Sequence, residues 1–332
     1  MLTIDPETGV TLTFEALPEI VKKIRHQIFL KGIEKGCVVA SVCNNSIGVI
    51  LTYLAAIHLS AIVVPINPAS KKYEIEEYLT KCDVQFVLTE NEYVNKLSVI
   101  LKQSKYDTIS IVLLEKLLEL NEVQLTQMDD NLFEPDLEDT AFIFFSSGTT
   151  GPPKLIRHSH RSLIAHLRQV SSIMNDNSMT YQFPRLYIGD RIYGVLPYFH
   201  SGGLITVFCM LFQGATVVIN KKWNDKEFLQ VIQDFKITAI NIVPTIMTFL
   251  LKSPLVDAYD LSSLRLIYIG AAKCDETDLR RLKHHLPKLR DVIQIFGMTE
   301  TGMLIFLTPS ANRALSSVGR AMPGVEAKVF FS

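Results

Sequence analysis

The chain has 332 residues, of which 48% are hydrophobic and 20% are charged, and its formal net charge is −1. This composition is typical of a globular protein with a large buried core, and the length allows one large domain or about two ordinary ones. The near-zero net charge gives no electrostatic basis for binding nucleic acid or an anionic membrane, so we exclude nucleic acid as a partner.

The cysteines and the amino terminus indicate the compartment. The five cysteines form no CxxC pair, which favours a reduced, intracellular location. The first residues, MLTIDPETG, contain no apolar run and are not a signal peptide. The long uncharged stretch at 37–70 is interrupted by polar residues 44–46, so we interpret it as strand, helix and strand, with the helix capped near Asn45 or Ser46, and expect no transmembrane segment.

Strand and helix patterns alternate through the first part of the chain. A hairpin is predicted at 2–13, and Thr13 is expected to cap a helix that runs from Phe14 and ends before Gly32. The further predicted strands are 37–42, 61–66, 84–88 and 108–113, and the predicted helices are 47–58, 71–81 and 91–102. We expect residues 114–138 to form a surface connection. This alternation is typical of a doubly wound α/β domain.

The same alternation resumes in the second half. A buried strand at 141–145 precedes a predicted helix at 160–174 and a mobile loop at 175–189. Further strands are predicted near 191–196, 215–219, 238–243, 264–269 and 291–296, with helices near 203–212, 225–235, 245–252 and 275–286. The expected fold class is α/β, with two doubly wound, mostly parallel sheets flanked by helices.

The strand at 141–145 leads into the sequence SSGTTGPPK, which has the chemistry of a phosphate site. Glycines let backbone N–H groups approach an anion, hydroxyls donate hydrogen bonds, and a lysine supplies charge, so the loop points to a nucleotide triphosphate. It differs from the common P-loop, because two prolines precede the lysine. A flexible surface turn is the alternative interpretation. The candidate phosphate-binding residues are Ser146, Ser147, Gly148, Thr149, Thr150, Gly151 and Lys154.

Three further strand ends carry candidate residues, since ligands in open α/β sheets bind at the carboxyl ends of strands. His200 lies within PYFHSGG and is either a satisfied core histidine or a group beside an acyl substrate. Gly270, Ala271 and Ala272 form either a tight turn or a surface small enough for a flat base. The sequence QIFGMTET starts at Gln294 and is either a strand end with a helix cap or a stacking and metal site.

Taken in order along the chain, these sequences resemble the adenylate-forming enzymes, which include acyl-CoA synthetases, 4-coumarate–CoA ligases and insect luciferases. Two positions depart from the family pattern, with Leu155 in place of a glycine and Lys273 in place of a proline. The resemblance implies most of one large AMP-binding domain, with approximate lobes at 1–190 and 191–315. SVGR at 317–320 resembles the entry to a small β-barrel, so 316–332 is expected to begin an incomplete barrel.

The resemblance also implies the reaction and the roles of the residues. The family converts a small-molecule carboxylic acid and ATP to an acyl-adenylate, and then to a thioester with coenzyme A. Lys154, His200, Thr299 and Glu300 are the implied catalytic residues, and Glu300 is the implied Mg²⁺ ligand. The implied ATP-binding residues are the phosphate loop named above, together with Gly270, Ala271, Ala272, Gln294, Phe296, Gly297, Met298 and Thr299.

In this family a ribose-binding aspartate, a hinge and a C-terminal lid with a catalytic lysine follow the point that corresponds to Ser332. We therefore expect the lid to be absent and catalysis to be impaired. A non-catalytic nucleotide- or acyl-binding protein is one alternative, and a fragment or splice form is another. The compartment is expected to be cytoplasmic or peroxisomal, although the terminal Phe-Phe-Ser is not a peroxisomal tripeptide. The sequence does not identify the acid.

Overall fold

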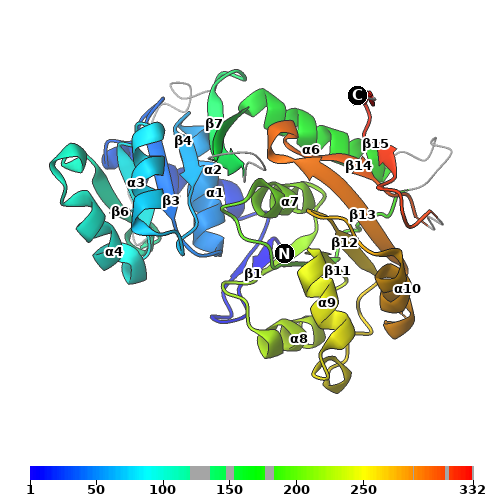
Figure 1. The fold of residues 1–332 in the computed structure, drawn as a ribbon. Helices are drawn as coiled ribbons and strands as arrows, with labels where there is room; N and C mark the ends of the chain where they lie inside the picture. Colours follow the sequence, from blue (N-terminus) through cyan, green and yellow to red (C-terminus); the bar gives the residue numbers. More distant parts are fainter. Residues whose placement is uncertain (120–134, 147–152, 176–182, 287, 311–313, 331–332) are drawn as a thin grey trace. The chain divides into compact units, whose positions relative to one another are not determined.

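The structure, a computed structural model, describes residues 1–119, 135–146, 153–175, 183–286, 288–310 and 314–330. The chain forms two compact units, each with its own sheet and hydrophobic core (Figure 1). The first unit comprises Met1–Thr11, Ile164–Pro197 and Ser201–Ser332, and the second comprises Leu12–Leu163 and Tyr198–His200. The expected lobes at 1–190 and 191–315 stay a prediction.

A six-stranded sheet forms the centre of the second unit. Its strands are β3 (Val38–Val42), β4 (Ile62–Pro65), β5 (Phe86–Thr89), β6 (Ser110–Leu113), β7 (Thr140–Ser146) and β8 (Lys154–Ser159), in the order β6-β5-β3-β4-β7-β8. Every neighbouring pair is parallel except β7 and β8. All of β3 is buried, as expected for a parallel sheet that is covered on both faces.

The helices of the second unit connect these strands. They are α1 (Leu17–Leu30), α2 (Ile47–His58), α3 (Lys72–Lys81), α4 (Asn91–Leu101) and α5 (Leu114–Leu117), with a 3₁₀ turn η1 at Ser104–Tyr106. The predicted cap of α2 is confirmed at Ser46, whose side chain accepts a hydrogen bond from the N–H of Val49. In the described part of the chain, none of the helices has the length and apolar character needed to cross a bilayer.

A nine-stranded sheet forms the centre of the first unit. Its strands are β1 (Thr3–Ile4), β2 (Thr11–Leu12), β9 (Arg191–Gly194), β10 (Thr216–Ile219), β11 (Ala239–Ile242), β12 (Leu266–Ile269), β13 (Asp291–Met298), β14 (Met303–Leu307) and β15 (Arg320–Ala321). Their order is β15-β14-β13-β12-β11-β9-β10-β1-β2. The central strands β9 to β12 and the first half of β13 are parallel, whereas β14 and β15 are antiparallel.

The remaining helices belong mainly to the first unit. They are α6 (His160–Asn175), α7 (Ser201–Phe212), α8 (Asp225–Asp234), α9 (Pro244–Lys252) and α10 (Glu276–His285), with 3₁₀ turns η3 (Val256–Ala258) and η4 (Thr299–Thr301). The predicted fold class is thus confirmed, because both sheets are mostly parallel and helices connect their strands. The predicted hairpin at 2–13 is also present, closed by a bond from the N–H of Asp5 to the carbonyl of Val10.

Several local predictions were wrong. Helix α1 begins at Leu17, three residues later than expected, and Thr13 instead accepts a bond from Ala16 N–H in the turn before it. Pro18 suits this first helical turn, because it has no N–H to leave unpaired. Residues 114–117 form α5, which packs against α2 at Gly48, rather than a surface connection. Strands β8 and β14 were not predicted at all.

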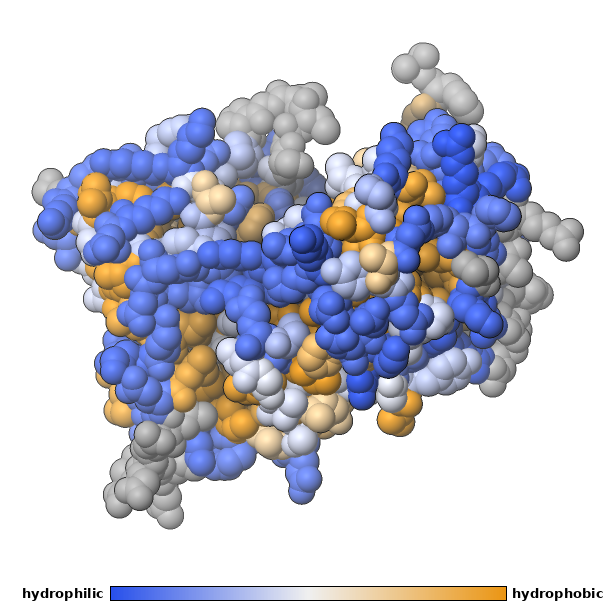
Figure 2. Space-filling model, turned by 90° about the horizontal axis from the view of Figure 1, so that it is seen from below, coloured by the Kyte–Doolittle hydropathy of each residue, from blue (hydrophilic) through white to orange (hydrophobic). Residues whose placement is uncertain are grey.

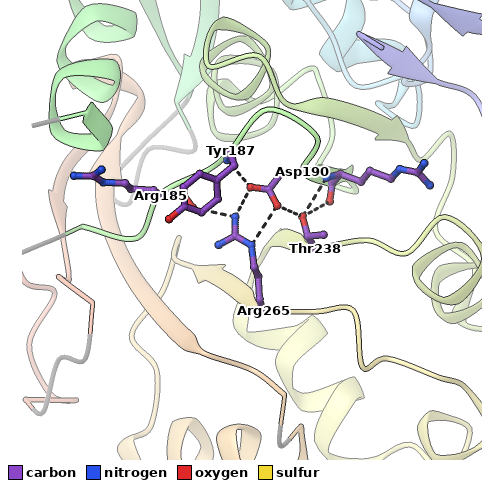
Figure 3. Close-up of polar contacts among 6 residues, drawn as sticks. Arg185, Tyr187, Asp190, Thr238 and Arg265 are labelled. Atoms are coloured by element: carbon purple, nitrogen blue, oxygen red, sulfur yellow. Dashed lines mark hydrogen bonds and ion pairs between the residues drawn. The ribbon is translucent and has the colours of Figure 1, made fainter.

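The segment before β9 is anchored at the amino ends of the central strands (Figure 3). Asp190 is buried and accepts bonds from the Tyr187 N–H at 2.6 Å, the Thr238 hydroxyl at 2.7 Å and Arg265 Nε at 3.2 Å. Arg265 also forms an ion pair with Asp190 and donates to the Arg185 carbonyl at 2.9 Å. Of the predicted loop at 175–189, Asn175 belongs to α6, 176–182 lie outside the described residues, and 183–189 form an irregular segment that is hydrogen-bonded at its end; its mobility stays a prediction.

The face of the molecule in Figure 2 is mostly hydrophilic, with hydrophobic groups interspersed. Exposed apolar side chains do occur, and Ile188 is 92% exposed. Scattered apolar residues of this kind are normal on a folded surface. They do not by themselves indicate a binding site.

Candidate functional site

The candidate residues fall in both compact units, and each group is described within its own unit. In the second unit, β7 and β8 pair as an antiparallel ladder in which Ser146 lies opposite Lys154. This pair flanks the predicted phosphate loop. Ser147, Gly148, Thr149, Thr150 and Gly151 lie outside the described residues.

The two described ends of this loop have different environments. Ser146 is buried, and its hydroxyl has no hydrogen-bond partner among the described residues. Lys154 is exposed at the start of β8. A buried hydroxyl and an exposed ammonium group at the two ends of a Gly/Ser/Thr loop are the donor types that an anion requires.

His200 ends the three-residue segment of the second unit that begins at Tyr198. Tyr198 is buried, and the rings of Phe199 and His200 lie 4.6 Å apart, tilted by 51°. The residue His200 as a whole is exposed to solvent. The protein atoms around its ring nevertheless desolvate the imidazole, and this lowers its pKa. The neutral form is therefore favoured at neutral pH, which leaves one ring nitrogen able to accept a hydrogen bond.

In the first unit, Gly270 directly follows β12 and lies in close contact with β13. A Cβ atom at Gly270 would lie 2.7 Å from the carbonyl oxygen of Ile295, so only glycine allows this approach. Ala271 has a left-handed backbone with φ of 68°, and both Ala271 and Ala272 are exposed. The turn thus presents small, strained and accessible residues beside the neighbouring strand.

The second half of β13 turns away from the parallel sheet and pairs with β14. The register shifts between Phe296 and Gly297, and a Cβ atom at Gly297 would lie only 1.3 Å from the Met303 carbonyl oxygen. Glycine is therefore required at this bulge. Phe296 is 44% exposed and Met298 is 45% exposed, so two apolar side chains flank the bulge at the surface.

The turn η4 follows β13 and carries Thr299 and Glu300. The hydroxyl of Ser201, at the first position of α7, donates to the hydroxyl of Thr299 at 3.3 Å. Glu300 is exposed. The turn therefore carries a hydroxyl bonded to Ser201 and an exposed carboxylate, three and four positions after the exposed Phe296.

Gln294 has a different environment from the other candidates on β13. It is buried, and its side-chain amide donates to the carbonyls of Leu315 at 2.6 Å and Ser317 at 3.0 Å. Its backbone N–H donates to the Thr308 hydroxyl at 2.9 Å. These bonds tie residues 315–317 to the sheet, so the amide already serves the fold.

The described residues contain no group of three or more His, Cys, Asp or Glu side chains that could hold a metal. Glu300 as a single exposed carboxylate still fits Mg²⁺, which keeps waters and substrate phosphates in its coordination shell and needs only one or two protein carboxylates. The donor chemistry thus fits a magnesium ion that arrives with phosphate groups.

Sequence reasoning missed two groups next to these residues. The first is Ser201, which directly follows His200, so a hydroxyl beside a candidate residue could have been noticed in the sequence. The second group is a buried chain in which Asn241 Nδ2 donates to the Thr206 hydroxyl at 3.1 Å, and that hydroxyl donates to the Gly202 carbonyl at 2.6 Å. Asn241 stands alone as an amide within the apolar strand β11, which was its indication.

Comparison with known proteins supports a single family. A profile of the AMP-binding enzymes matches residues 2–330. The chain is 30% identical over 308 residues to 4-coumarate–CoA ligase 3 of Arabidopsis thaliana, an alignment that covers 91% of this chain and 53% of that protein. The chain thus spans about half the length of the curated relatives it matches.

Solved structures give the same fold. The inhibitor-bound N-terminal domain of FACL13 from Mycobacterium tuberculosis matches with a TM-score of 0.82 at 23% identity, over 97% of this chain and 78% of that one. ATP-bound MatB from Rhodopseudomonas palustris matches with a TM-score of 0.78 at 20% identity, over 97% and 61%. Because the profile match spans nearly the whole sequence, the chain belongs to the AMP-binding enzyme family.

Proposed function

We propose that this chain provides the nucleotide- and acid-binding groups of an adenylate-forming acid–thiol ligase. The reaction joins a carboxylic acid to ATP, giving an acyl-adenylate and pyrophosphate, and then transfers the acyl group to coenzyme A. Membership of the AMP-binding enzymes supports the first step. The similarity to 4-coumarate–CoA ligases supports the second.

The first unit contributes the groups for the base and the metal. Phe296 stacks on adenine beside the small residues Gly270, Ala271 and Ala272, because an exposed aromatic face is available there. Thr299 donates its hydroxyl to a phosphate, and Glu300 holds Mg²⁺. When bound, Mg²⁺ supplies positive charge to the phosphates.

The second unit contributes the groups for the phosphates and the acid. The backbone and hydroxyls of residues 146–151 cradle the phosphates, and Lys154 neutralises charge that develops on the leaving pyrophosphate. His200 lies beside the substrate carboxylate. Its lowered pKa keeps the imidazole neutral, so the ring accepts a hydrogen bond or orients the acid without adding positive charge.

One observation carries the proposal. At the glycine bulge the chain folds back onto β14, Phe296 stays exposed, and Thr299 and Glu300 lie on the next turn. A strand end with a plain helix cap, the alternative interpretation, requires none of these features. The geometry is what an adenine ring and a metal-bound phosphate would use.

Calorimetry with ATP and Mg²⁺ tests the binding roles. Lys154→Ala is expected to weaken binding by about 1.5–3 kcal/mol through the loss of a charge-assisted contact. Glu300→Gln is expected to make the affinity for ATP depend less on Mg²⁺. Phe296→Ala is expected to lower the affinity for ATP both with and without Mg²⁺. Lys31→Ala, which changes an exposed lysine directly after α1, is the matched control. A folded parent that does not bind ATP contradicts the proposal.

An activity assay then separates a ligase from a protein that only binds nucleotide. Pyrophosphate release and thioester formation are measured across a panel of fatty and aromatic acids with coenzyme A. Turnover with any acid supports the ligase and identifies the acid class. ATP binding without pyrophosphate release supports the alternative of a non-catalytic nucleotide- or acyl-binding protein.

A further inference from the structure

The turn that carries His200 is held by a residue far away in the sequence. Tyr198, Phe199 and His200 belong to the second compact unit, although the residues on either side of them belong to the first. The backbone N–H of Tyr198 donates to Asn45 Oδ1 at 2.8 Å, across 153 positions of sequence. Both residues are buried, with Tyr198 2% and Asn45 7% exposed.

Asn45 lies in the short loop between β3 and α2, where each polar side chain has a separate role. Asn44 Nδ2 donates to Glu90 at 2.8 Å, and Asn44 Oδ1 accepts from the Tyr93 hydroxyl at 2.9 Å. Ser46 caps α2. Asn45 instead bonds to the His200 turn, through the N–H of Tyr198.

We propose that Asn45 is a positioning residue that fixes the backbone of the His200 turn and thereby orients the imidazole toward the acid. This inference rests on the proposed function and deepens it. A buried N–H without an acceptor is costly, so the Asn45 carbonyl selects one backbone conformation at Tyr198. His200 follows two residues later, and its ring packs on Phe199. The backbone conformation at Tyr198 therefore sets the direction of the imidazole ring.

A positioning role for Asn45 and a purely structural role have different consequences for ligand binding. Asn45 acts through the backbone and touches no reacting atom. If it positions His200, its loss affects recognition of the acid more than recognition of ATP, whose proposed ligands are Lys154 and the residues around Phe296. If it is only structural, its loss lowers stability and affects both ligands equally.

Two measurements on the ligand-free protein test the positioning directly. Asn45→Ala removes the acceptor, and we expect the amide of Tyr198 to exchange its hydrogen about ten- to a hundredfold faster. We also expect the ring resonances of His200 to shift, with His200→Gln used to assign them. Asn45→Asp keeps an acceptor oxygen and is expected to restore slow exchange, even if Asn45→Ala proves too unstable to study.

Asn44→Ala is the matched control, because Asn44 is adjacent and equally buried but is bonded to Glu90 and Tyr93. It should leave the Tyr198 amide and the His200 ring unchanged. Unchanged exchange at Tyr198 in Asn45→Ala would overturn the inference, and so would an equal effect of the control. These readouts need no ligand, so they decide the positioning even if the proposed function fails.

Binding measurements then test whether the position of His200 affects recognition of the acid. The probe is a non-hydrolysable acyl-adenylate analogue, compared with ATP for each variant. We expect Asn45→Ala to lower the affinity for the analogue about tenfold, while the affinity for ATP stays within about twofold of the parent value. Asn45→Asp is expected to recover the affinity for the analogue. Equal losses for both probes would overturn the inference. A parent that binds neither probe would instead count against the proposed function.

Discussion

Single glycines decide how closely strands and helices approach at the candidate residues. Gly203 lies in the first turn of α7, and a Cβ atom there would lie 2.1 Å from the carbonyl oxygen of Pro197. The adjacent Gly202 has no atom within 4 Å of such a Cβ. Neighbouring glycines in one motif therefore have different structural roles, and the sequence alone does not distinguish them.

This pair gives the first prediction. Gly203→Ala is expected to lower the free energy of unfolding by about 1–3 kcal/mol, because the backbone of Pro197 cannot move aside easily. Gly202→Ala is expected to be neutral or to stabilise by about 0.4–1 kcal/mol, since the unfolded chain loses freedom. Urea denaturation measures both variants. Similar losses in the two would show that the close approach to Pro197 does not constrain the fold.

His160 gives a prediction about pH. It is half-buried at the start of α6, its Nε2 atom has no partner among the described residues, and desolvation by burial is the main cause that lowers its pKa from the ordinary 6.5. As the pH falls through about 6.5, the unfolded chain takes up a proton that the folded chain resists, so stability falls. We expect the free energy of unfolding to decrease between pH 7.5 and 5.5, and to decrease less in His160→Gln. The same slope in both proteins would contradict this reasoning.

At the scale of elements, the amino and carboxyl ends of the strands in the nine-stranded sheet have different chemistry. The carboxyl ends of β12 and β13 carry the small and exposed candidate residues, whereas the amino ends are tied by the Asp190 and Arg265 ion pair (Figure 3). The ring of Tyr187 also lies 5.2 Å from the Arg265 guanidinium carbon. These contacts join the segment before β9 to the start of β12.

We predict that this ion pair is important for stability. Asp190→Ala is expected to cost about 3–5 kcal/mol, because it leaves the Arg265 charge partly buried without its partner. Arg265→Met in the same background should recover part of the loss, and a double-mutant cycle measures the coupling. Glu276→Ala breaks the exposed Arg280 pair on α10 and should cost no more than about 0.5 kcal/mol. A cost for Asp190→Ala as small as that of the surface control would show that the network does not hold the segment.

The sequence predicted most elements because their strands are continuously apolar. Strands β10, β11 and β12 are buried at every residue, and such runs between short turns are recognisable without a structure. Strand β8 was missed because it is an edge strand in which half of the residues are exposed and one is buried, so its sequence KLIRHS lacks the apolar pattern. Strand β14 was missed because an apolar run after Thr299 and Glu300 fits a capped helix equally well.

The candidate site was predictable in chemistry and not in geometry. Residue types such as Phe296 and Glu300 indicated stacking and metal binding, and these roles stay predictions. Contacts between distant residues, such as Tyr198 with Asn45, depend on topology and left no local pattern. Gln294 shows the converse, because a residue in a motif proved to be occupied by hydrogen bonds to 315 and 317.

At the scale of the whole molecule, the first unit is assembled from separate pieces of the chain. Strand β1 pairs in parallel with β10, where the N–H of Val217 donates to the Leu2 carbonyl at 2.9 Å. The Thr216 hydroxyl donates to the carbonyl of Met1 at 3.0 Å. The amino terminus is therefore an internal part of the nine-stranded sheet and not a detachable tail.

Deletion of residues 1–11 tests this arrangement. We expect the amides of β10, Thr216–Ile219, to exchange hydrogen faster, because β10 becomes an unprotected edge strand. The amides of β3 in the other sheet, Val38–Val42, serve as the internal control and should keep their protection. Unchanged exchange in β10 would mean that the terminal strand contributes little to the sheet.

The pairing of β1 with β10 also has a consequence during synthesis on the ribosome. Strand β1 is made before its partner β10, and the bonded residues Met1 and Thr216 lie 215 positions apart. At about 5–20 residues per second, the strand waits roughly 10–40 s before β10 is made. Throughout that interval β1 has only β2, its neighbour in the hairpin, to pair with, although Leu2 and Ile4 are buried in the finished protein. The nascent chain therefore exposes the edge of β1 that pairs with β10 until residues 216–219 have been made.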